Sequence, residues 1–187
     1  MGRLIFGMMA SLDGFVTDDK GRFEWGQIDQ EVHRFAQGEE EKVGVSIYGR
    51  RMYEMMAVWD TLDADPNVSQ AERDFAAVWQ RNDKIVVSRT LPEVTTRRTR
   101  LVRGLGLDEM ARLKAETARD VSVSGPTLAA TFLRQGLVDE VSVYIVPVLV
   151  GRGLRMFPDL TETLKLERLE QRAFANGTTY LRFAVRR

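Results

Sequence analysis

The feature that most constrains the fold is an alternation between short β-branched runs and longer segments with helical spacing of apolar residues. An apolar run predicts a strand at 3–9, and runs with β-branched residues predict strands at 43–47, 84–88, 99–102, 120–124 and 141–150. Between them, apolar residues three and four positions apart predict helices at 28–36, 52–59, 69–79, 108–117 and 127–135. Strands that alternate with helices pack as a largely parallel sheet covered on both faces. We therefore predict a three-layer α/β/α sandwich.

The C-terminal part has a different pattern. Asn176-Gly177 separates two strand-like segments, 165–174 and 178–185. An Asn-Gly pair in this position is a strong β-hairpin signal, because both residues tolerate the positive φ of a tight turn. The sheet should therefore be mixed, mostly parallel, and should end in an antiparallel C-terminal hairpin. The strand 141–150 and this hairpin would leave an edge that a second copy can cover, so we expect a homodimer.

Length and composition narrow the class of protein. The 187 residues suit one domain spanning 1–187. Lys+Arg and Asp+Glu balance at 27 each, whereas nucleic-acid-binding surfaces carry a basic excess, so nucleic acid is not an expected partner. With no cysteine and a single histidine, His33, thiolate zinc and iron–sulfur sites are excluded, and no metal is expected. The lack of cysteine, of a membrane-length apolar run and of a signal peptide predicts a cytoplasmic protein that does not bind membranes.

Two turns that follow predicted strands have residues suited to phosphate binding. In the first, Tyr48–Glu54 (YGRRMYE), a glycine lets the backbone approach a phosphate and the arginines add charge. The alternative is an ordinary strand-to-helix turn with a solvated arginine pair. In the second, Ser124–Ala129 (SGPTLA), a glycine precedes a proline placed at the first helical turn. Its alternative is a well-capped helix with no ligand.

A third turn carries a hydroxyl and a guanidinium. Ser88 and Arg89 leave the strand 84–88, and four more arginines follow at 97, 98, 100 and 103. Such a cluster could hold the 2′-phosphate that distinguishes NADP from NAD. A solvated charged face is the commoner explanation for the four later arginines, whereas for Ser88 and Arg89 both interpretations stay open.

The order of these motifs resembles a known family. The segments occur in the series 10–14 (ASLDG), 48–54 (YGRRMYE), 87–89 (VSR), 124–129 (SGPTLA), 136–141 (GLVDEV), 147–153 (PVLVGRG) and 157–158 (FP). This series resembles the reductase domain of the bifunctional riboflavin-biosynthesis protein and its stand-alone relatives, which have the dihydrofolate-reductase-like fold. Each motif is weak alone, but their order is specific and covers nearly the whole chain.

The resemblance implies an NADPH-dependent reductase similar to 5-amino-6-(5-phosphoribosylamino)uracil reductase and dihydrofolate reductase, acting on a small planar pteridine- or pyrimidine-like substrate. By this analogy, the cofactor phosphates should face Gly49, Arg50, Arg51 and Met52. Ser88 and Arg89 should meet the adenosine ribose and its 2′-phosphate. The pyrophosphate and nicotinamide side should contact Ser124, Gly125, Pro126, Thr127 and Leu128. Ala10 should line the nicotinamide pocket, with Ser11 and Asp13 on a mobile segment after the first strand.

The substrate half of the family pattern is altered in this chain. Riboflavin-pathway reductases tend to have a glutamate where this chain has Val123, and a threonine-, aspartate- and arginine-bearing stretch where it has 52–59 (MYEMMAVW). We also expect no deaminase partner domain, because the 187 residues are accounted for by the reductase-like motifs. An alternative from another class is therefore a non-catalytic nucleotide-binding or regulatory protein that kept the NADP groove and lost the substrate site.

Hydride transfer depends mainly on positioning, because the cofactor supplies the chemistry. The candidate proton donors are Asp29, four residues after Trp25, and Asp13. Asp29 is equally well placed to cap a helix, and Asp13 with its following glycine is a turn signal. Trp25 and Trp59 are candidate substrate contacts as an aromatic lid over a flat ring, with burial in the core as the alternative for each.

Overall fold

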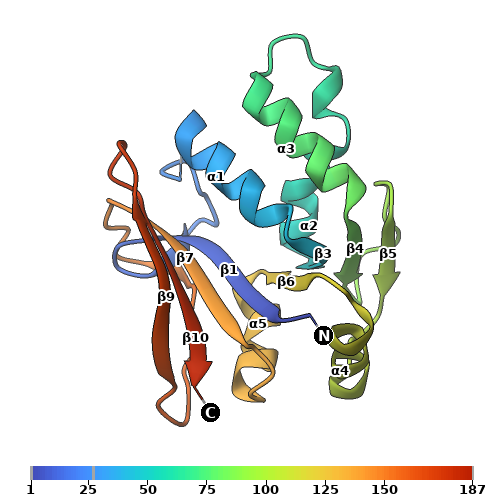
Figure 1. Ribbon diagram of the computed structural model, residues 1–187, viewed down its shortest axis with the longest axis vertical. Helices are drawn as coiled ribbons and strands as arrows, with labels where there is room; N and C mark the ends of the chain where they lie inside the picture. The colour runs from blue at the N-terminus through green and yellow to red at the C-terminus, as the bar shows by residue number, and fades with distance from the viewer. Residues whose placement is uncertain (1, 27, 187) are drawn as a thin grey trace.

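The computed structural model describes residues 2–26 and 28–186. Its main feature is a sheet of eight strands in the order β5-β4-β3-β6-β1-β7-β10-β9 (Figure 1). The strands are β1 (Leu4–Ser11), β3 (Val43–Gly49), β4 (Asp83–Val87), β5 (Thr99–Val102), β6 (Asp120–Ser124), β7 (Glu140–Val146), β9 (Lys165–Ala173) and β10 (Thr179–Arg186). Pairing is parallel from β5 through to β7, and β10 and β9 add antiparallel strands. The predicted mixed sheet with an antiparallel C-terminal hairpin is confirmed.

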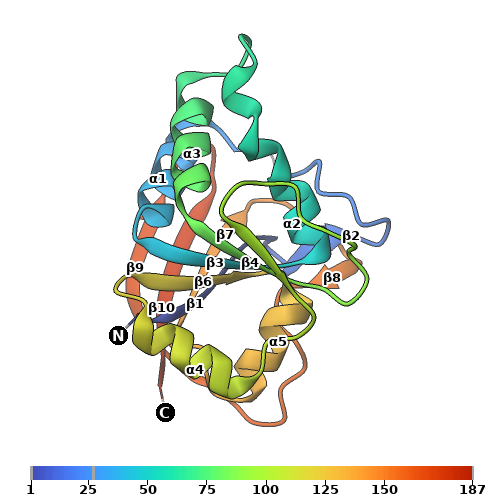
Figure 2. The same ribbon diagram turned by 90° about the vertical axis from the view of Figure 1, so that its right-hand side faces the viewer.

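Helices cover both faces of this sheet, as Figure 2 shows. One face carries α1 (Gln30–Glu40), α2 (Arg50–Met56) and α3 (Gln70–Arg81), and the other carries α4 (Leu107–Glu116) and α5 (Pro126–Arg134). Two 3₁₀ segments, η1 (Ala57–Asp60) and η2 (Leu62–Ala64), follow α2. The three-layer α/β/α sandwich is therefore confirmed. No helix within the described residues has the length and apolarity needed to cross a bilayer.

Capping residues define the start of two helices. At α3, the Ser69 hydroxyl oxygen accepts the Glu72 N–H at 3.3 Å, and the Glu72 carboxylate accepts the Ser69 N–H at 2.7 Å. This is a capping box, and a serine followed three positions later by glutamate is its sequence signature. At α1, the Asp29 carboxylate accepts the Val32 N–H at 2.9 Å. Both helices thus begin where a side chain satisfies an otherwise unpaired backbone N–H.

The alternation of side chains along β3 divides the core into two parts. Val45 and Ile47 belong to the cluster that also contains Phe132 of α5, whereas Tyr48 packs with Trp79 of α3. Successive strand residues point to opposite faces, so a shift of one residue would turn each set toward the helices of the wrong face. This burial fixes the register of β3 and therefore places Gly49 at the carboxyl edge of the sheet.

The segment after β7 differs from the prediction of a continuous strand over 141–150. β7 ends at Val146, and the Val148 N–H donates to the Val146 carbonyl in a tight turn at 2.8 Å. The chain then forms β8 (Gly153–Arg155), which pairs with β2 (Phe15–Asp18) in a two-stranded ribbon that the sequence did not indicate. A Cβ on Gly153 would lie 1.8 Å from the Thr17 carbonyl oxygen, so only glycine permits this close approach.

The edge of the sheet also differs from expectation. β7 lies between β1 and β10, so it is an interior strand, and the free C-terminal edge is β9. The apolar composition of 141–150 reflects this interior position, because strands covered on both sides are continuously apolar.

Candidate functional site

The carboxyl ends of β3 and β6 bring the two glycine turns together. These strands are parallel neighbours with Tyr48 opposite Ser124, so Gly49 and Gly125 leave the same edge. A Cβ built on Gly125 would lie 4.0 Å from the Gly49 nitrogen and 3.8 Å from Met52 Cβ. The turns predicted separately from the sequence therefore form one surface of exposed backbone, at the edge where open α/β sheets bind ligands.

Backbone geometry requires glycine only in the second of the two turns. Gly125 has φ +103°, a conformation that residues with a Cβ rarely adopt. Gly49 has an ordinary φ of −76°, and no heavy atom lies within 4 Å of the position that its Cβ would occupy. The space in front of Gly49 is open, and the first turn of α5 presents N–H groups without intrahelical partners at the same edge. Together they make a cradle that suits an anion.

The turn after β6 is tied to β1. The Ser124 hydroxyl donates to the Gly7 carbonyl at 3.4 Å, and the Gly125 N–H lies 3.2 Å from Met8 Sδ. Ala10, two residues further along β1, is 2% exposed. β1, which the resemblance assigns to the nicotinamide side, therefore supports the backbone of the cradle. It is able to do so because it pairs in parallel with β6.

The turn after β4 lies beside the first glycine turn. Val87 pairs with Gly49, and the Arg50 guanidinium donates to Thr90 Oγ1 at 3.3 Å as well as to its own-helix partner Glu54 at 2.7 Å. Ser88 is buried, and its oxygen accepts the N–H groups of Leu91 at 3.0 Å and Thr90 at 3.3 Å. Its hydroxyl can still donate one hydrogen bond. Arg89 is exposed. The structure thus brings Arg50, Ser88 and Arg89 to one place.

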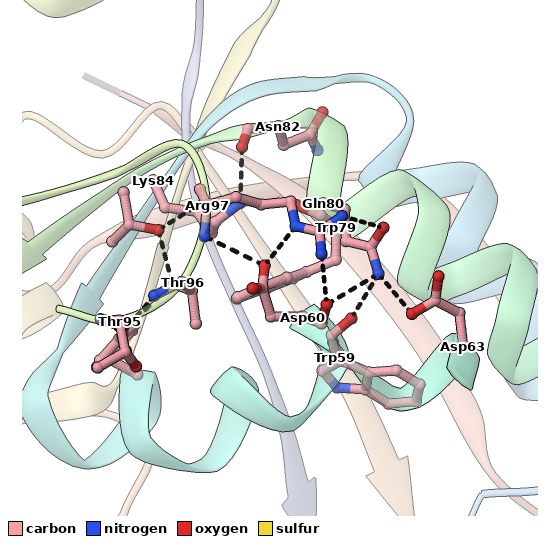
Figure 3. Close-up of polar contacts among 12 residues, drawn as sticks. Trp59, Asp60, Asp63, Trp79, Gln80, Asn82, Lys84, Thr95, Thr96 and Arg97 are labelled. Carbon is pink, nitrogen blue, oxygen red and sulfur yellow. Dashed lines mark hydrogen bonds and ion pairs between the residues drawn. The ribbon is translucent and has the colours of Figure 1, made fainter. Parts of the chain in front are cut away.

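The four later arginines contact protein groups and do not gather around a phosphate-sized site. Arg97 pairs with the Asp60 carboxylate at 3.3 Å and donates to Gln80 Oε1 at 3.2 Å, as Figure 3 shows. Arg98 pairs with Asp83 at 2.7 Å, and Arg100 with Glu109 at 3.7 Å. Arg103 donates to the backbone carbonyls of Ser88, Leu91 and Pro92. The side chains of Arg97, Arg98 and Arg100 are 54%, 54% and 53% exposed, as on a solvated charged face, whereas Arg103 is held by backbone carbonyls.

Asp13 has a structural role in the loop after β1. Its carboxylate accepts the Ser11 hydroxyl at 2.6 Å and the N–H groups of Val150 at 3.1 Å and Gly151 at 2.7 Å. These hydrogen bonds, the Ser11 hydroxyl first, lower the pKa of Asp13 to about 2. A general acid needs a pKa near the working pH, so these contacts argue against Asp13 as a proton donor. They join the segments that follow β1 and β7.

Asp29 and Trp59 lie on the α1 side of the sheet, and Trp25 lies in the segment that leads into α1. Asp29 is exposed and caps α1, which favours the capping interpretation over the acid. Trp59 is half-buried and packs against Phe75 and His33, with ring centroids 4.6 and 5.5 Å away. Trp25 packs edge-to-face on Phe23 at 4.9 Å. Trp59 thus joins the packing between α3 and η1, and no contact between the two tryptophans identifies them as a paired lid.

Burial lowers the pKa of His33, and the charge of Glu72 opposes that shift. The Nδ1 atom of His33 and the Nε1 atom of Trp25 are buried without a hydrogen-bond partner among the described residues. His33 is therefore held neutral in an aromatic contact rather than positioned as an acid.

Two surface depressions lie away from the glycine turns. One, of about 410 Å³, is lined by α1 and by Arg172 of β9, and the other, of about 500 Å³, by α3 with Arg97 and Arg98. Neither contains a residue of the cradle. Both are wide surface hollows, whereas the cradle combines glycine backbone, a helix N-terminus and exposed arginine, so the chemistry identifies the cradle as the candidate site.

Comparison with known proteins identifies the family. The profile of the RibD C-terminal domain matches residues 3–180. The chain belongs to the RibD C-terminal domain family. It is 26% identical over 182 residues to the uncharacterized protein YyaP of Bacillus subtilis (strain 168), covering 96% of this chain and 93% of that protein. Over 62 residues, or 32% of this chain and 18% of the relative, it is 48% identical to the riboflavin biosynthesis protein RibD of Corynebacterium ammoniagenes.

Solved structures of the family share the fold. A candidate riboflavin biosynthesis protein of Shewanella sp. PV-4 superposes with a TM-score of 0.73 at 22% identity, covering 99% of both chains. A pyrimidine reductase-like protein of Corynebacterium diphtheriae gives a TM-score of 0.67 at 14% identity, covering 100% of this chain and 92% of that one. These superpositions establish the dihydrofolate-reductase-like fold. At identities this low they do not identify the substrate, which has to be inferred from the residues of this chain.

Tyr53 and Arg103 are the residues near the site whose roles the sequence did not indicate. The phenol oxygen of Tyr53 accepts the N–H groups of Thr95 at 2.9 Å and Thr96 at 3.3 Å. The position of Tyr53 inside the 48–54 motif was the one sequence signal for this role. The loop that it binds lies 42 positions further along the chain, so the sequence does not reveal the contact. For Arg103, no local pattern distinguishes an arginine that binds carbonyls from one in solvent.

Proposed function

We propose that this chain is an NADPH-dependent reductase that transfers hydride to a small planar substrate of pteridine- or pyrimidine-like structure. The observation that carries the proposal is the junction of the two glycine turns, where Gly49 and Gly125 lie at one edge beside Arg50 and Arg89. Membership of the RibD C-terminal domain family supports a reductase-like, riboflavin-pathway type of activity.

The residues at this edge fit a phosphorylated dinucleotide. The open space in front of Gly49 and the first turn of α5 suit a pyrophosphate, with Arg51, Met52, Thr127 and Leu128 supplying backbone around it. Arg89 is exposed, and Arg50 is held nearby through Thr90, so two guanidinium groups can bind the 2′-phosphate. When bound, NADPH supplies the hydride.

The chain's own contribution is to bind and orient the cofactor and the substrate and to exclude water from them. The contact of Asp13 with Val150 and Gly151 holds the segments after β1 and β7 together beside the nicotinamide side. Because Asp13 is a strong hydrogen-bond acceptor and Asp29 is a helix cap, neither is the donor that we expect to protonate the substrate. We propose that the proton comes from water, and that catalysis depends on positioning.

The names of the structural relatives point to the substrate class. The Thermotoga maritima relative, with a TM-score of 0.68 at 13% identity, is a diaminohydroxyphosphoribosylaminopyrimidine deaminase/5-amino-6-(5-phosphoribosylamino)uracil reductase, and this chain covers 57% of it. A planar heterocycle suits the exposed faces of aromatic side chains, and Trp25 and Trp59 remain the candidates for that contact.

We also propose that the protein is a cytoplasmic homodimer. β9 is a free edge of nine residues, and Leu166 and Leu169 on it are 45% and 49% exposed. A long exposed edge strand is a template for pairing unless it is covered. Sedimentation should give a dimer at micromolar concentration, and a monomer there would contradict the proposal.

NADPH oxidation tests the function. The purified protein should consume NADPH with at least one member of a panel of pteridines, pyrimidines and quinones. Calorimetric titration with NADPH, run in parallel, distinguishes the outcomes. Binding without turnover would favour the non-catalytic nucleotide-binding alternative, whereas no binding would contradict both.

A further inference from the structure

The loop between β4 and β5, residues 88–98, is held at both ends and in its middle; we call it the strap. At its start, Ser88 Oγ accepts the N–H groups of Thr90 and Leu91. In its middle, the Tyr53 phenol oxygen accepts the N–H groups of Thr95 and Thr96. These contacts fix a loop that has no helix or strand of its own.

The far end of the strap is fixed to η1 and α3. Figure 3 shows Arg97 between Asp60 and Gln80. Its guanidinium donates to the Asp60 carbonyl at 3.1 Å and pairs with the Asp60 carboxylate at 3.3 Å. Gln80 in turn donates to Asp63 Oδ1 at 3.0 Å. The strap is therefore held against both α2, through Tyr53, and η1, through Asp60.

Arg103, in the segment after β5, holds the first turn of the strap. Its Nη1 donates to the carbonyl oxygens of Ser88 at 3.1 Å and Leu91 at 2.5 Å, and its Nη2 donates to that of Pro92 at 3.4 Å. The planar guanidinium reaches all three acceptors without changing conformation. Ser88 and Leu91 are buried, so their carbonyl oxygens gain a charged donor in a position where water has little access.

Arg89 lies inside this turn, between the residues that Arg103 holds. It is exposed, and its flexible side chain, which carries five N–H donors in a fixed planar fork, must be ordered when a ligand arrives. A fixed backbone at Ser88 and Leu91 limits the directions that the Arg89 side chain can take. Binding costs less free energy when the contacting group is already restricted, because less conformational entropy is lost.

We infer that Arg103 is a positioning residue for recognition of the cofactor's 2′-phosphate: it binds the backbone of Ser88–Pro92 and so presents Arg89 to the phosphate. The inference rests on the proposed use of NADPH. Arg103 directs its donors to protein carbonyls, so it acts through Arg89 and not by contacting the phosphate itself.

The test compares adenosine 2′,5′-bisphosphate with adenosine 5′-monophosphate, two probes that differ only in the 2′-phosphate. Calorimetry on the whole protein gives the ratio of their dissociation constants, which we call the 2′-phosphate preference. Arg103→Met should lower this preference roughly five- to tenfold. Arg103→Lys keeps a charged donor but loses the fork, and should lie between Met and wild type.

Arg100→Met is the matched control. It removes one positive charge three positions earlier, where the arginine's only side-chain partner among residues 2–26 and 28–186 is Glu109, in a long ion pair at 3.7 Å. It should leave the 2′-phosphate preference unchanged, which separates positioning from a general loss of charge. Thermal unfolding of each variant confirms that the comparison is made on folded protein.

A double-mutant cycle with Arg89→Ala decides between positioning and direct contact. If Arg103 acts through Arg89, adding Arg103→Met to Arg89→Ala should change the preference no further. Additive losses would show that Arg103 contacts the phosphate itself, and an unchanged preference in Arg103→Met alone would also overturn the inference. If wild-type protein does not distinguish the two probes, the proposed use of NADPH fails as well.

Discussion

Substitution of Gly49 by serine should affect folding and cofactor binding in opposite directions. Gly49 is the N-cap of α2, with φ −76° and ψ 166°, and it provides no side-chain hydrogen bond to the helix. Serine adopts this conformation without strain and is a better N-cap than glycine. The open space around the site accepts its Cβ, because no heavy atom lies within 4 Å. We expect the free energy of unfolding to rise by about a few tenths of a kcal/mol.

The same substitution should weaken NADPH binding. In the proposed complex, a phosphate approaches the backbone at Gly49, so the serine side chain would occupy the phosphate position. We expect a loss of at least about tenfold in affinity, which corresponds to ~1.4 kcal/mol. Thermal unfolding of the free protein and calorimetric titration with NADPH measure the two effects separately.

Gly106→Ser provides the matched control. Gly106 is the N-cap of α4 with nearly the same backbone, φ −79° and ψ 167°, and its Cβ position is equally open. This variant should gain similar stability and keep the wild-type affinity for NADPH. If Gly49→Ser and Gly106→Ser bind NADPH equally well, no phosphate lies against Gly49 and the cradle is misplaced.

Three further substitutions test individual residues. Gly125→Val should abolish NADPH binding while the protein still folds; its φ of +103° implies a stability loss of about 1–3 kcal/mol, and normal NADPH binding would place the cradle elsewhere. Asp29→Asn should change stability, turnover and its pH dependence little, because Asn and Asp cap equally well; a large fall in turnover of the folded variant would restore Asp29 as the acid. The lowered pKa of Asp13, about 2, means that its contacts with Val150 and Gly151 should persist above its usual value of 3.8 and be lost as the pH falls through 2. Hydrogen exchange should show those two amides losing protection in Asp13→Ala at neutral pH. Unchanged protection would contradict the hydrogen bonds between Asp13 and these amides.

Local signals were sufficient to predict much of the fold. The strands 99–102 and 120–124 were predicted with the bounds that the structure has, because β-branched runs there are bounded by turn residues. The hairpin around Asn176-Gly177 and the capping box at Ser69 also followed from short-range chemistry. For the hairpin turn and the capping box, the stabilising partner lies within a few residues, so the sequence alone contains the information. The two strands pair with strands far along the chain, and only their bounds are indicated locally.

Other features depend on partners far along the chain. The strand predicted over 141–150 stops at Val146, where the chain turns, and beyond the turn the N–H groups of Val150 and Gly151 bind Asp13, 138 positions from Gly151. The apolar stripe predicted as one helix over 52–59 is divided into α2 and η1, which leaves Met55 50% exposed. Periodicity describes one segment at a time and does not reveal such distant hydrogen bonds.

The candidate site, like the fold, could be predicted from the sequence only in part. The glycine turns could be located from sequence because a strand, a glycine and a helix follow one another directly. Their contact across β3 and β6 required the strand order, which no single motif contains. The role of Arg103 also required three dimensions, because its acceptors are backbone carbonyls 11 to 15 positions away.

The most direct test of the account is the affinity of the wild-type protein and of Arg89→Ala for NADPH and NADH, measured by calorimetry. A charge-assisted contact with the 2′-phosphate contributes about 1.5–3 kcal/mol, so wild type should prefer NADPH by tenfold or more. Arg89→Ala should lose roughly that factor for NADPH and bind NADH almost as before. Equal affinity of the wild-type protein for the two cofactors, or equal losses for both in Arg89→Ala, would contradict the proposed NADPH site.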